Sequence, residues 1–340
     1  MIKYLGSKRK LTGAILETVA QLRHGHRVLD LFSGTSRVGH ALKRAGYRVV
    51  ANDHNAYAHT LARCYVEADA ECYLDDARRL VDEFNRLPGR PGYFTATFCE
   101  GSRFFHPKNG ARVDAIREAI AEKGLDPILE AVLLVSLMEA ADRVDSTCGV
   151  QMAYLKQWAP RALRDLELRV PDLAPASSHG PCEAHRLDAV EAARTLSADV
   201  VYLDPPYNQH SYLSNYHVWE SLVLWDKPEV YGRAQKRVDC RSRKSAFNSR
   251  LQFTTAFTDV LDGLDALLIV VSFNDEGFID REAMEALLSR YGEVTVLAHD
   301  YKRYVGAQIG IFNPKGERVG EVSHLYNKEF LYIVHRDENR

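Results

Sequence analysis

One tetrapeptide, Asp204-Pro205-Pro206-Tyr207, has the residue types to hold an amino group for reaction. It follows the apolar run 199–203, which predicts a buried strand, and two successive prolines end such a strand abruptly. The exocyclic amine of adenine or cytosine carries two protons, and the Asp204 carboxylate and the Pro205 carbonyl are two acceptors for them. Holding both protons aims the nitrogen lone pair and stabilises the positive charge that develops on the nitrogen. The predicted chemistry is methylation of a base amine.

Aromatic residues at and after this corner predict how the base is held. Chemistry on a base edge inside a duplex requires extrusion of the nucleotide, and the flipped base is then sandwiched by aromatic or apolar side chains. Tyr207 is the expected stacking partner, and Tyr212, Tyr216, His217 and Trp219 follow it closely. The alternative is an ordinary Pro-Pro turn with these aromatic side chains packed beneath it.

A small-residue turn near the N-terminus has the pattern of a nucleoside site. The run 27–32 predicts a strand that leads into a turn around Gly34, where a ligand can approach the backbone. The next predicted strand, 47–53, ends on Asp53, whose carboxylate is placed to accept hydrogen bonds from ribose hydroxyls. Ser36 stands where a dinucleotide fingerprint has its second glycine, so an ordinary strand-to-helix turn is the alternative.

Local charge, and not net charge, points to a nucleic-acid partner, because 44 Lys and Arg nearly balance 46 Asp and Glu. Residues 227–250 hold eight basic side chains against two acids, and phosphate contact is the expected use, with a solvated loop as the alternative. The stretch 103–112 combines basic, aromatic and amide side chains of the kind that read bases, and its alternative is an ordered loop whose two phenylalanines belong to the core. The side chains expected at DNA are Arg103, Lys108, Asn109, Arg112, Arg237, Arg241, Arg243 and Lys244.

The elements that must position these residues alternate between strands and helices. Predicted strands are the apolar runs 27–32, 47–53, 183–188, 199–203, 267–272, 294–297 and 330–334. Such alternation predicts an α/β fold with a Rossmann-like, doubly wound and mostly parallel sheet. The region 71–180 is mainly helical and ends in the turn-rich stretch 171–181. We therefore expect a catalytic domain made of residues 1–70 and 181–340, and a helical insertion domain, 71–180, for target recognition.

Composition excludes several other classes of protein. With 46% hydrophobic and 26% charged residues, the 340-residue chain has the composition of an average globular protein. Its six cysteines include no C-x-x-C pair, which disfavours a zinc site and a disulfide framework, and no metal is expected. No apolar run approaches the roughly 20 residues that span a bilayer. We expect a protein of the reducing cytosol that does not bind membranes.

These motifs, in this order, resemble the Dam-like, DPPY-type DNA amino-methyltransferases, a family usually described as adenine-specific. The resemblance covers most of the chain outside the insertion, and it implies a class I methyltransferase fold with S-adenosylmethionine as cofactor. The N-terminal segment 3–8 looks like the family's motif near the methionine moiety of the cofactor, and 30–35 resembles the glycine loop under the same moiety. Asp188 is similar to the acid that holds the cofactor's adenine amine. The cofactor-binding residues that the resemblance implies are Tyr4, Gly6, Lys8, Asp30, Phe32, Ser33, Gly34, Thr35, Asp53, Asp188 and Asp204.

The resemblance also implies a function. We expect a sequence-specific methyltransferase that transfers a methyl group from S-adenosylmethionine to the N6 amine of adenine in double-stranded DNA by base flipping. The corner at 204–207 does not distinguish adenine from cytosine, so an N4-cytosine methyltransferase with the same mechanism is the alternative. An inactive DNA-binding relative and an RNA methyltransferase are further alternatives. The expected setting is the prokaryotic cytosol, at the nucleoid. The recognition sequence, the oligomeric state and the existence of a companion restriction endonuclease stay open.

Overall fold

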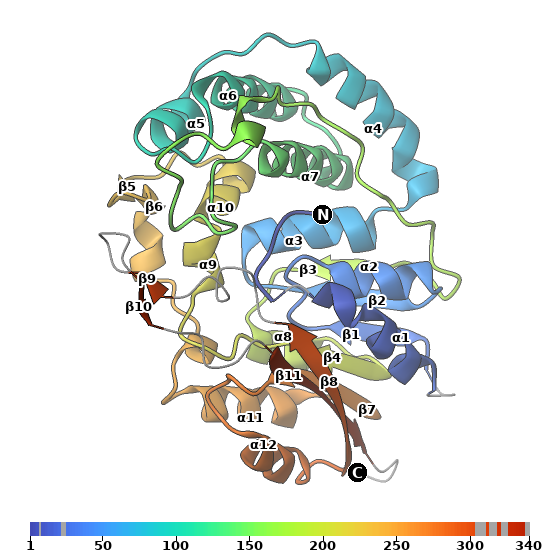
Figure 1. Ribbon diagram of the computed structural model, residues 1–340. Coiled ribbons are helices and arrows are strands. Elements are labelled where there is room, and N and C mark those ends of the chain that lie inside the picture. The colour runs from blue at the N-terminus through green and yellow to red at the C-terminus, as the bar shows by residue number, and fades with distance from the viewer. Residues whose placement is uncertain (7, 22–24, 303–310, 313–317, 321–325, 337–340) are drawn as a thin grey trace.

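A sheet of seven strands, in the order β3-β2-β1-β4-β7-β11-β8, forms the centre of the computed structural model (Figure 1). The structure describes residues 1–340 except 7, 22–24, 303–310, 313–317, 321–325 and 337–340. Its strands are β1 (Arg27–Asp30), β2 (Arg48–Asn52), β3 (Glu183–His185), β4 (Val200–Leu203), β7 (Leu268–Asn274), β8 (Glu293–Lys302) and β11 (Tyr326–His335). Strands β3, β2, β1, β4 and β7 are parallel, and β11 runs antiparallel to both of its neighbours. The predicted mostly parallel sheet is confirmed.

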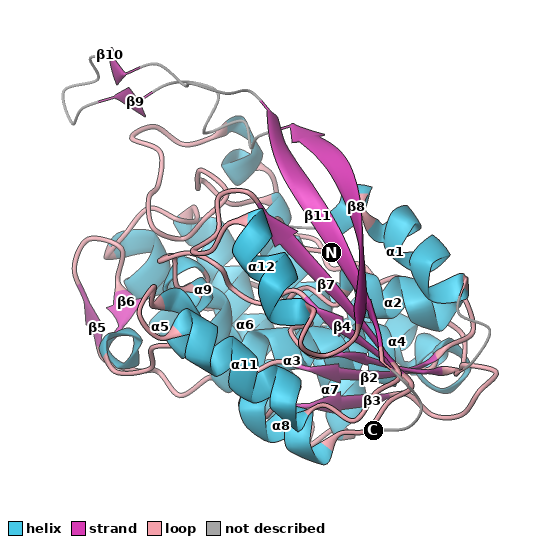
Figure 2. Ribbon diagram, turned by 90° about the horizontal axis from the view of Figure 1, so that it is seen from below, coloured by secondary structure: helices cyan, strands magenta, loops and turns pink. Residues whose placement is uncertain are grey.

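Helices cover both faces of this sheet, as a doubly wound fold requires (Figure 2). One face packs against α8 (Ala189–Thr195), α11 (Phe253–Gly263) and α12 (Arg281–Leu288). The other face packs against α1 (Thr12–Ala20) and α2 (Arg37–Arg44). Strands covered on both faces are mostly apolar, which explains why β4 reads as a continuous hydrophobic run and why Val28 and Leu29 form the apolar centre of β1.

A layer of helices lies above the sheet and contains the predicted insertion (Figure 1). The helices of this layer are α3 (Ala56–Ala62), α4 (Ala70–Asn85), α5 (Tyr93–Thr95), α6 (Pro107–Glu122), α7 (Pro127–Arg143), α9 (Tyr212–Asn215) and α10 (His217–Leu224), with π-helical turns at η2 (Arg63–Glu67) and η3 (Ala96–Glu100). One hydrophobic cluster joins α4 to α7 with α3 and α10, so the insertion shares its core with segments on both sides of it in the sequence. The turn-rich stretch 171–181 holds neither helix nor strand. The division into two domains stays a prediction.

Short elements complete the described chain. They are the 3-10 turns η1 (Lys8–Lys10), η4 (Pro160–Leu163), η5 (Val238–Arg241) and η6 (Ala246–Asn248), and the two-stranded ribbons of β5 (Val230–Tyr231) with β6 (Lys236–Arg237) and of β9 (Ile311–Phe312) with β10 (Arg318–Gly320). Among the described residues, no helix is both long enough and apolar enough to cross a membrane.

Two sequence-based expectations about local structure need correction. The strand predicted over 183–188 ends at His185, because Asp188 accepts a hydrogen bond from the backbone N–H of Val190 and caps helix α8. The predicted recognition loop 103–112 becomes helix α6 at Pro107, since proline at a first helical position needs no hydrogen-bond partner for its nitrogen. In both stretches the residue at the start of the helix, Asp188 or Pro107, is of a type that is also common in turns.

Candidate active site

One cavity lies at the carboxyl ends of β1, β2 and β4, the edge of a parallel sheet where ligands bind. Its lining includes every residue that the resemblance implied for the cofactor: Tyr4, Gly6, Lys8, Asp30, Phe32, Ser33, Gly34, Thr35, Asp53, Asp188 and Asp204. Pro206 also lines it, together with Ser211 and Tyr212 from the segment after the corner. These residues, from Tyr4 to Tyr212, span more than two hundred positions of the chain, and the strand order brings them to one place.

The glycine turn and Asp53 hold each other in position. The Asp53 carboxylate accepts hydrogen bonds from the backbone N–H of Gly34 at 3.1 Å and of Asn55 at 2.9 Å. Gly34 has a φ of +50° and Ser36 a φ of 57°, so the turn passes twice through the left-handed region. Burial raises the pKa of Asp53. A carboxylate fixed in this way beside the turn can accept hydrogen bonds from the hydroxyl groups of a ribose.

Asp30 brings a second acid into the cavity from the end of β1. Its Oδ2 accepts a hydrogen bond from the N–H of Gly39 at 3.2 Å. Burial, followed by the neighbouring charge of Asp204, raises the pKa of Asp30 to about 7. Within the described part of the chain, Asp30 Oδ1, Ser33 Oγ and Asn55 Oδ1 are buried and lack hydrogen-bond partners. Buried polar atoms are normally paired, so these atoms fit a polar, cationic ligand such as S-adenosylmethionine.

The N-terminal segment 3–8 packs on the segment that follows the corner at 204–207. The Tyr4 ring stacks with those of Tyr212, at 5.1 Å, and Tyr216, at 4.5 Å, which also stack with each other. The N–H of Leu5 donates a hydrogen bond to the Tyr216 hydroxyl at 2.7 Å. Gly6 has a φ of +74°, and a Cβ there would lie 3.0 Å from the Tyr212 hydroxyl. A side chain at position 6 would therefore disturb this contact.

Asp204 lies at the end of β4 and pairs with Lys8, whose Nζ is 3.1 Å from its Oδ1. Lys8 also donates a hydrogen bond to Glu329 of β11, a residue that the sequence did not nominate. Burial raises the pKa of Asp204 to about 6 although Lys8 opposes the shift. Burial alone would lower the pKa of Lys8, but the carboxylates of Asp204 and Glu329, with Tyr207 close by, raise it, so Lys8 is a cation.

Tyr207 is fixed at the side of this corner. Its hydroxyl accepts a hydrogen bond from the Asn274 side chain at 2.9 Å, and its ring lies 5.0 Å from that of Phe273. The backbone N–H of Phe278 donates to the Tyr207 carbonyl at 3.1 Å. Asp204 and Pro206 line the cavity, whereas Pro205 and Tyr207 are not part of its lining.

The other aromatic residues after the corner divide between site and core. Tyr212 lines the cavity, whereas Tyr216, His217 and Trp219 are almost fully buried in the helical layer. Nε2 of His217 lies 2.9 Å from the carbonyl oxygen of Gln151. Packing beneath the turn, the alternative considered for this segment, therefore describes these three residues.

The basic and amide side chains at the start of α6 have mixed positions. Phe104 and Phe105 are core residues, as the alternative for this stretch supposed. Asn109 is buried and bonds to the backbone of Ala162, Arg164 and Leu166, so DNA does not reach it in this conformation. Three cations are more accessible. Arg103 stacks on the Trp158 ring at 4.5 Å, Lys108 pairs with Asp165 at 2.8 Å, and Arg112 is partly exposed.

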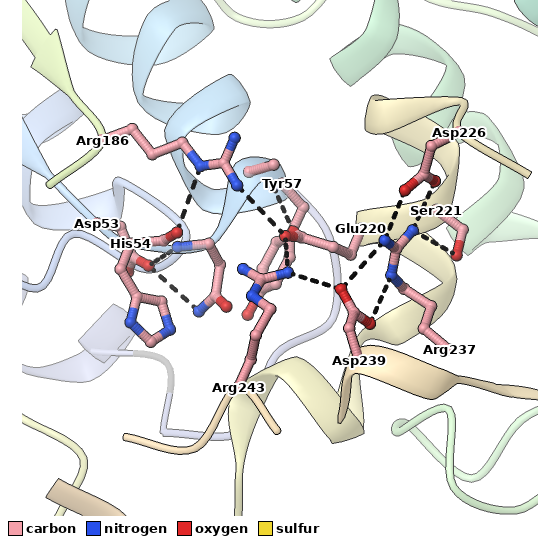
Figure 3. Close-up of polar contacts among 12 residues, drawn as sticks. Asp53, His54, Tyr57, Arg186, Glu220, Ser221, Asp226, Arg237, Asp239 and Arg243 are labelled. Atoms are coloured by element: carbon pink, nitrogen blue, oxygen red, sulfur yellow. Dashed lines mark hydrogen bonds and ion pairs between the residues drawn. The ribbon is translucent and has the colours of Figure 1, made fainter. Parts of the chain in front are cut away.

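The basic stretch 227–250 is divided in the same way (Figure 3). Arg237 is 3% exposed and makes two hydrogen bonds of 2.7 Å to Asp226 and further ones to Asp239. Arg243 is partly exposed and pairs with Glu220 at 3.0 Å and with Asp239 at 3.2 Å. Arg241 and Lys244 are exposed, with Arg241 lying 4.1 Å from the centre of the Tyr231 ring.

Glu220, in α10, joins this basic stretch to the cofactor cavity. Its side chain is fully buried, and Figure 3 shows it between the guanidinium groups of Arg186 and Arg243. It also accepts a hydrogen bond from the N–H of Tyr57, at the start of α3, at 3.0 Å. Arg243 itself lines the cavity. The sequence signal for Glu220, an acid inside the apolar helix 217–224, is too common to identify it.

The fold and cavity are those of a class I, Rossmann-like methyltransferase. Comparison with protein families gives the class more narrowly, because residues 4–287 match the family of D12 class N6 adenine-specific DNA methyltransferases. The chain belongs to this family. The target base of this family is adenine, which decides between the amines of adenine and cytosine that residues 204–207 alone do not distinguish.

Individual relatives agree. The chain is similar to the type II methyltransferase M.NlaIII of Neisseria lactamica, with 31% identity over 97% of this chain and all of that protein. It is similar to M.CviAII of Paramecium bursaria Chlorella virus 1, with 28% identity over 89% of this chain and 92% of that one. The match to M.FokI of Planomicrobium okeanokoites, at 28% identity, covers 99% of this chain but 53% of M.FokI. The expected sequence-specific DNA methyltransferase of adenine is confirmed.

Proposed function

We propose that this protein uses S-adenosylmethionine to methylate the N6 amine of an adenine that is flipped out of duplex DNA. The observation that carries the proposal is the convergence of Asp30, Asp53, Asp188 and the corner at Asp204 on one cavity. Bound there, S-adenosylmethionine would supply an electrophilic methyl group, whose bond to the sulfonium sulfur breaks with both electrons staying on sulfur, so that S-adenosylhomocysteine leaves. Asp53 would accept hydrogen bonds from its ribose hydroxyls, and Asp188 would accept one from its adenine amine. The N-terminal motif, Asp30 and the glycine turn would hold the methionine part.

The corner would present the target amine. Asp204 and the carbonyl of Pro205 accept its two protons, so its lone pair is held toward the cavity. Lys8 occupies Oδ1 of Asp204, which leaves Oδ2 for the amine. Once the nitrogen has bonded the methyl carbon through its lone pair, it carries positive charge and releases one proton. The Asp204 carboxylate, which accepts a hydrogen bond from the amine, would take this proton. Tyr207, fixed by Asn274, would stack on the flipped base.

We propose a DNA surface made of the accessible cations near this corner. It would include Arg103, Lys108 and Arg112 of the helical layer, and Arg241, Arg243 and Lys244 of the basic stretch. Asn109 and Arg237 are left out, because both are buried and their hydrogen bonds are made within the protein. The helical layer that carries half of these residues would serve target recognition.

Two substitutions separate the roles of the acids. Asp204→Ala is expected to abolish methyl transfer and to leave cofactor affinity within about threefold of wild type, since Asp204 contacts the amine. Asp53→Ala is expected to weaken the cofactor by about tenfold or more, because both the ribose acceptor and the anchor of Gly34 are lost. Calorimetric titration with the cofactor and transfer of labelled methyl to unmethylated genomic DNA measure the two properties. Equal loss of both properties in both variants would contradict these roles.

The product and the setting can be tested together. Treated DNA should yield N6-methyladenine when it is digested to nucleosides, and sequencing of methylated positions should show one short recognition sequence. Unmethylated RNA of the same sequence should not compete. Several relatives are named type II methyltransferases or modification methylases, so we propose a restriction endonuclease of the same specificity as a companion in a prokaryotic cytosol. An extract of the source cells should then cut this sequence only when it is unmethylated.

A further inference from the structure

Glu329 and Asp204 share one buried cation, the ammonium group of Lys8. Lys8 belongs to η1, Asp204 follows β4 and Glu329 lies on β11, so three distant segments each bring one charge to the same point. The side chains of Lys8 and Glu329 are each 7% exposed, and that of Asp204 is 20% exposed. Water therefore screens these charges weakly, and each acid feels the other.

The position of Glu329 does not depend on Lys8 alone. The Ser272 hydroxyl of β7 donates a hydrogen bond to the same Glu329 oxygen at 3.0 Å. In the antiparallel pairing of β11 with β7, Glu329 stands opposite Asn274, whose side chain holds the Tyr207 hydroxyl. The β7–β11 strand pair thus supports both the lysine behind Asp204 and the tyrosine beside it.

The charges have a consequence for Asp204. If Asp204 were the only acid near Lys8, the two charges would cancel and the carboxylate would be a weak acceptor for a proton of the amine. With Glu329, one cation faces two anions, and the group of three carries a net charge of about minus one at neutral pH. A buried ammonium also has three protons to place, and Glu329 accepts one of them.

We propose that Glu329 is a positioning residue for methyl transfer: it anchors Lys8 and keeps the Asp204 carboxylate basic enough to hold the target amine and take its proton. The proton leaves the nitrogen, whose electron pair stays on the nitrogen, and bonds to an Asp204 oxygen. The inference rests on the proposed role of Asp204.

Other groups that face Asp204 must be separated from Glu329 in any test. They are Tyr202 of β4, Tyr212 of α9, Tyr207 beside the corner, and Asp30 of β1. Burial raises the pKa values of Tyr202 and Tyr212, so these two stay neutral in the range of interest. Asp30 has a pKa of about 7 and titrates in the same range as Asp204. Its contribution is common to all variants that keep Asp30.

The experiment measures the rate of a single turnover against pH, with saturating S-adenosylmethionine and unmethylated plasmid DNA. In Glu329→Gln the acid limb of the profile is expected to move down by about one pH unit, because a negative charge next to Asp204 is lost. The plateau rate is expected to fall by at most about tenfold, the loss for a base one pKa unit weaker. Glu329→Asp keeps the charge at a greater distance and should give a smaller shift in the same direction. Ser272→Ala removes a neutral hydrogen bond and should leave the limb in place.

The inference is overturned if Glu329→Gln lowers the rate but leaves the limb in place, or if Ser272→Ala moves the limb as far. Thermal melting and cofactor affinity report whether each variant is folded. If Glu329→Gln does not fold, Glu329→Asp decides, and an unmoved limb in that variant overturns the inference. Asp204→Ala provides the separate check: activity in that variant would remove the proposed role of Asp204 itself, whereas an inactive Asp204→Ala with unmoved Glu329 variants would remove only the role of Glu329.

Discussion

Ser36 shows how much a single backbone conformation matters at the cofactor turn. Its φ of 57° lies in the left-handed region, where a side chain costs about 1–2 kcal/mol relative to glycine. The residue is buried, and its hydroxyl has no hydrogen-bond partner within the described residues. Ser36 is therefore a strained residue at the position where a dinucleotide fingerprint has glycine.

Ser36→Gly is expected to stabilise the protein by up to about 1 kcal/mol, because the strain of the left-handed backbone disappears. Urea unfolding measures the change. The matched control is Ser289→Gly, since Ser289 ends α12 with a right-handed φ of −62°. The same substitution there should destabilise the protein slightly. A gain at both positions would show that the φ of Ser36 is not the cause.

A pH dependence is also expected at the scale of single residues, from Asp30 and Asp204. Both pKa values are raised above the ordinary range, to about 7 and about 6, so the stability that the neutral forms contribute is present at low pH. It is lost as pH rises through these values. A ligand with positive charge favours the ionised form of Asp30, the acid that we place at the methionine part of the cofactor, and its affinity should rise as pH rises through the pKa of Asp30.

The affinity for S-adenosylmethionine is accordingly expected to increase by about tenfold between about pH 5 and pH 8. S-adenosylhomocysteine, which lacks the sulfonium charge, should show a smaller increase. Calorimetry in buffers of different ionisation enthalpy measures both affinities and the protons released. An equal pH dependence for the two ligands would mean that the sulfonium charge is not near these acids.

At the scale of elements, α10 connects the basic stretch to the cofactor cavity. Glu220 holds Arg243, and Arg243 lies both in the cavity wall and in the segment that we expect to contact DNA. Asp239 extends the same network to Arg237 (Figure 3). Glu220 thus holds in place a segment that would contact both the cofactor and DNA.

Glu220→Gln is expected to loosen the segment 236–250, because Arg243 loses the charge that it pairs with. Tryptic cleavage in this segment should become about tenfold faster, as for a local loss of about 1.4 kcal/mol. Rates of cleavage on native protein, followed by mass spectrometry, measure the effect. Glu229→Gln, at an exposed acid beside the same segment, is the control and should not change the rate.

At the scale of the molecule, DNA binding depends on which cations the fold leaves accessible. The proposed DNA contacts come from the helical layer and from the basic stretch, and their side chains are at least partly exposed. Of the eight side chains expected at DNA, Asn109 and Arg237 serve the interior instead. The two groups should respond differently to substitution.

Lys244→Gln is expected to reduce the slope of log affinity for DNA against log salt concentration by about 0.9, the value for one phosphate contact. Arg237→Gln should leave this slope unchanged and should lower the free energy of unfolding by about 2 kcal/mol, because two carboxylates lose their partner. Fluorescence anisotropy over a series of salt concentrations, together with urea unfolding, measures both. A reduced slope in Arg237→Gln without loss of stability would place Arg237 at DNA.

The sequence by itself determined most elements of the sheet, and it named residues that the fold brings together at one cavity. Apolar runs located the seven strands of the sheet within a few residues, and the signal is strongest for β4 and β7, which are buried and apolar along nearly their whole length. The predicted acids Asp30, Asp53 and Asp204 and the turn at Gly34 line one cavity for a related reason. They stand directly after these strands, and the carboxyl ends of parallel strands meet at one edge of the sheet.

Only the tertiary structure decided which polar side chains serve ligands and which serve the interior. Glu329 and Glu220 were missed because their partners, Lys8 and Arg243, lie far from them in the sequence. The sequence suggested Arg237 as a phosphate contact, because it does not show that Asp226 and Asp239 pair with this side chain. Burial and pairing arise from the packing of distant segments, and a local pattern of residue types contains neither.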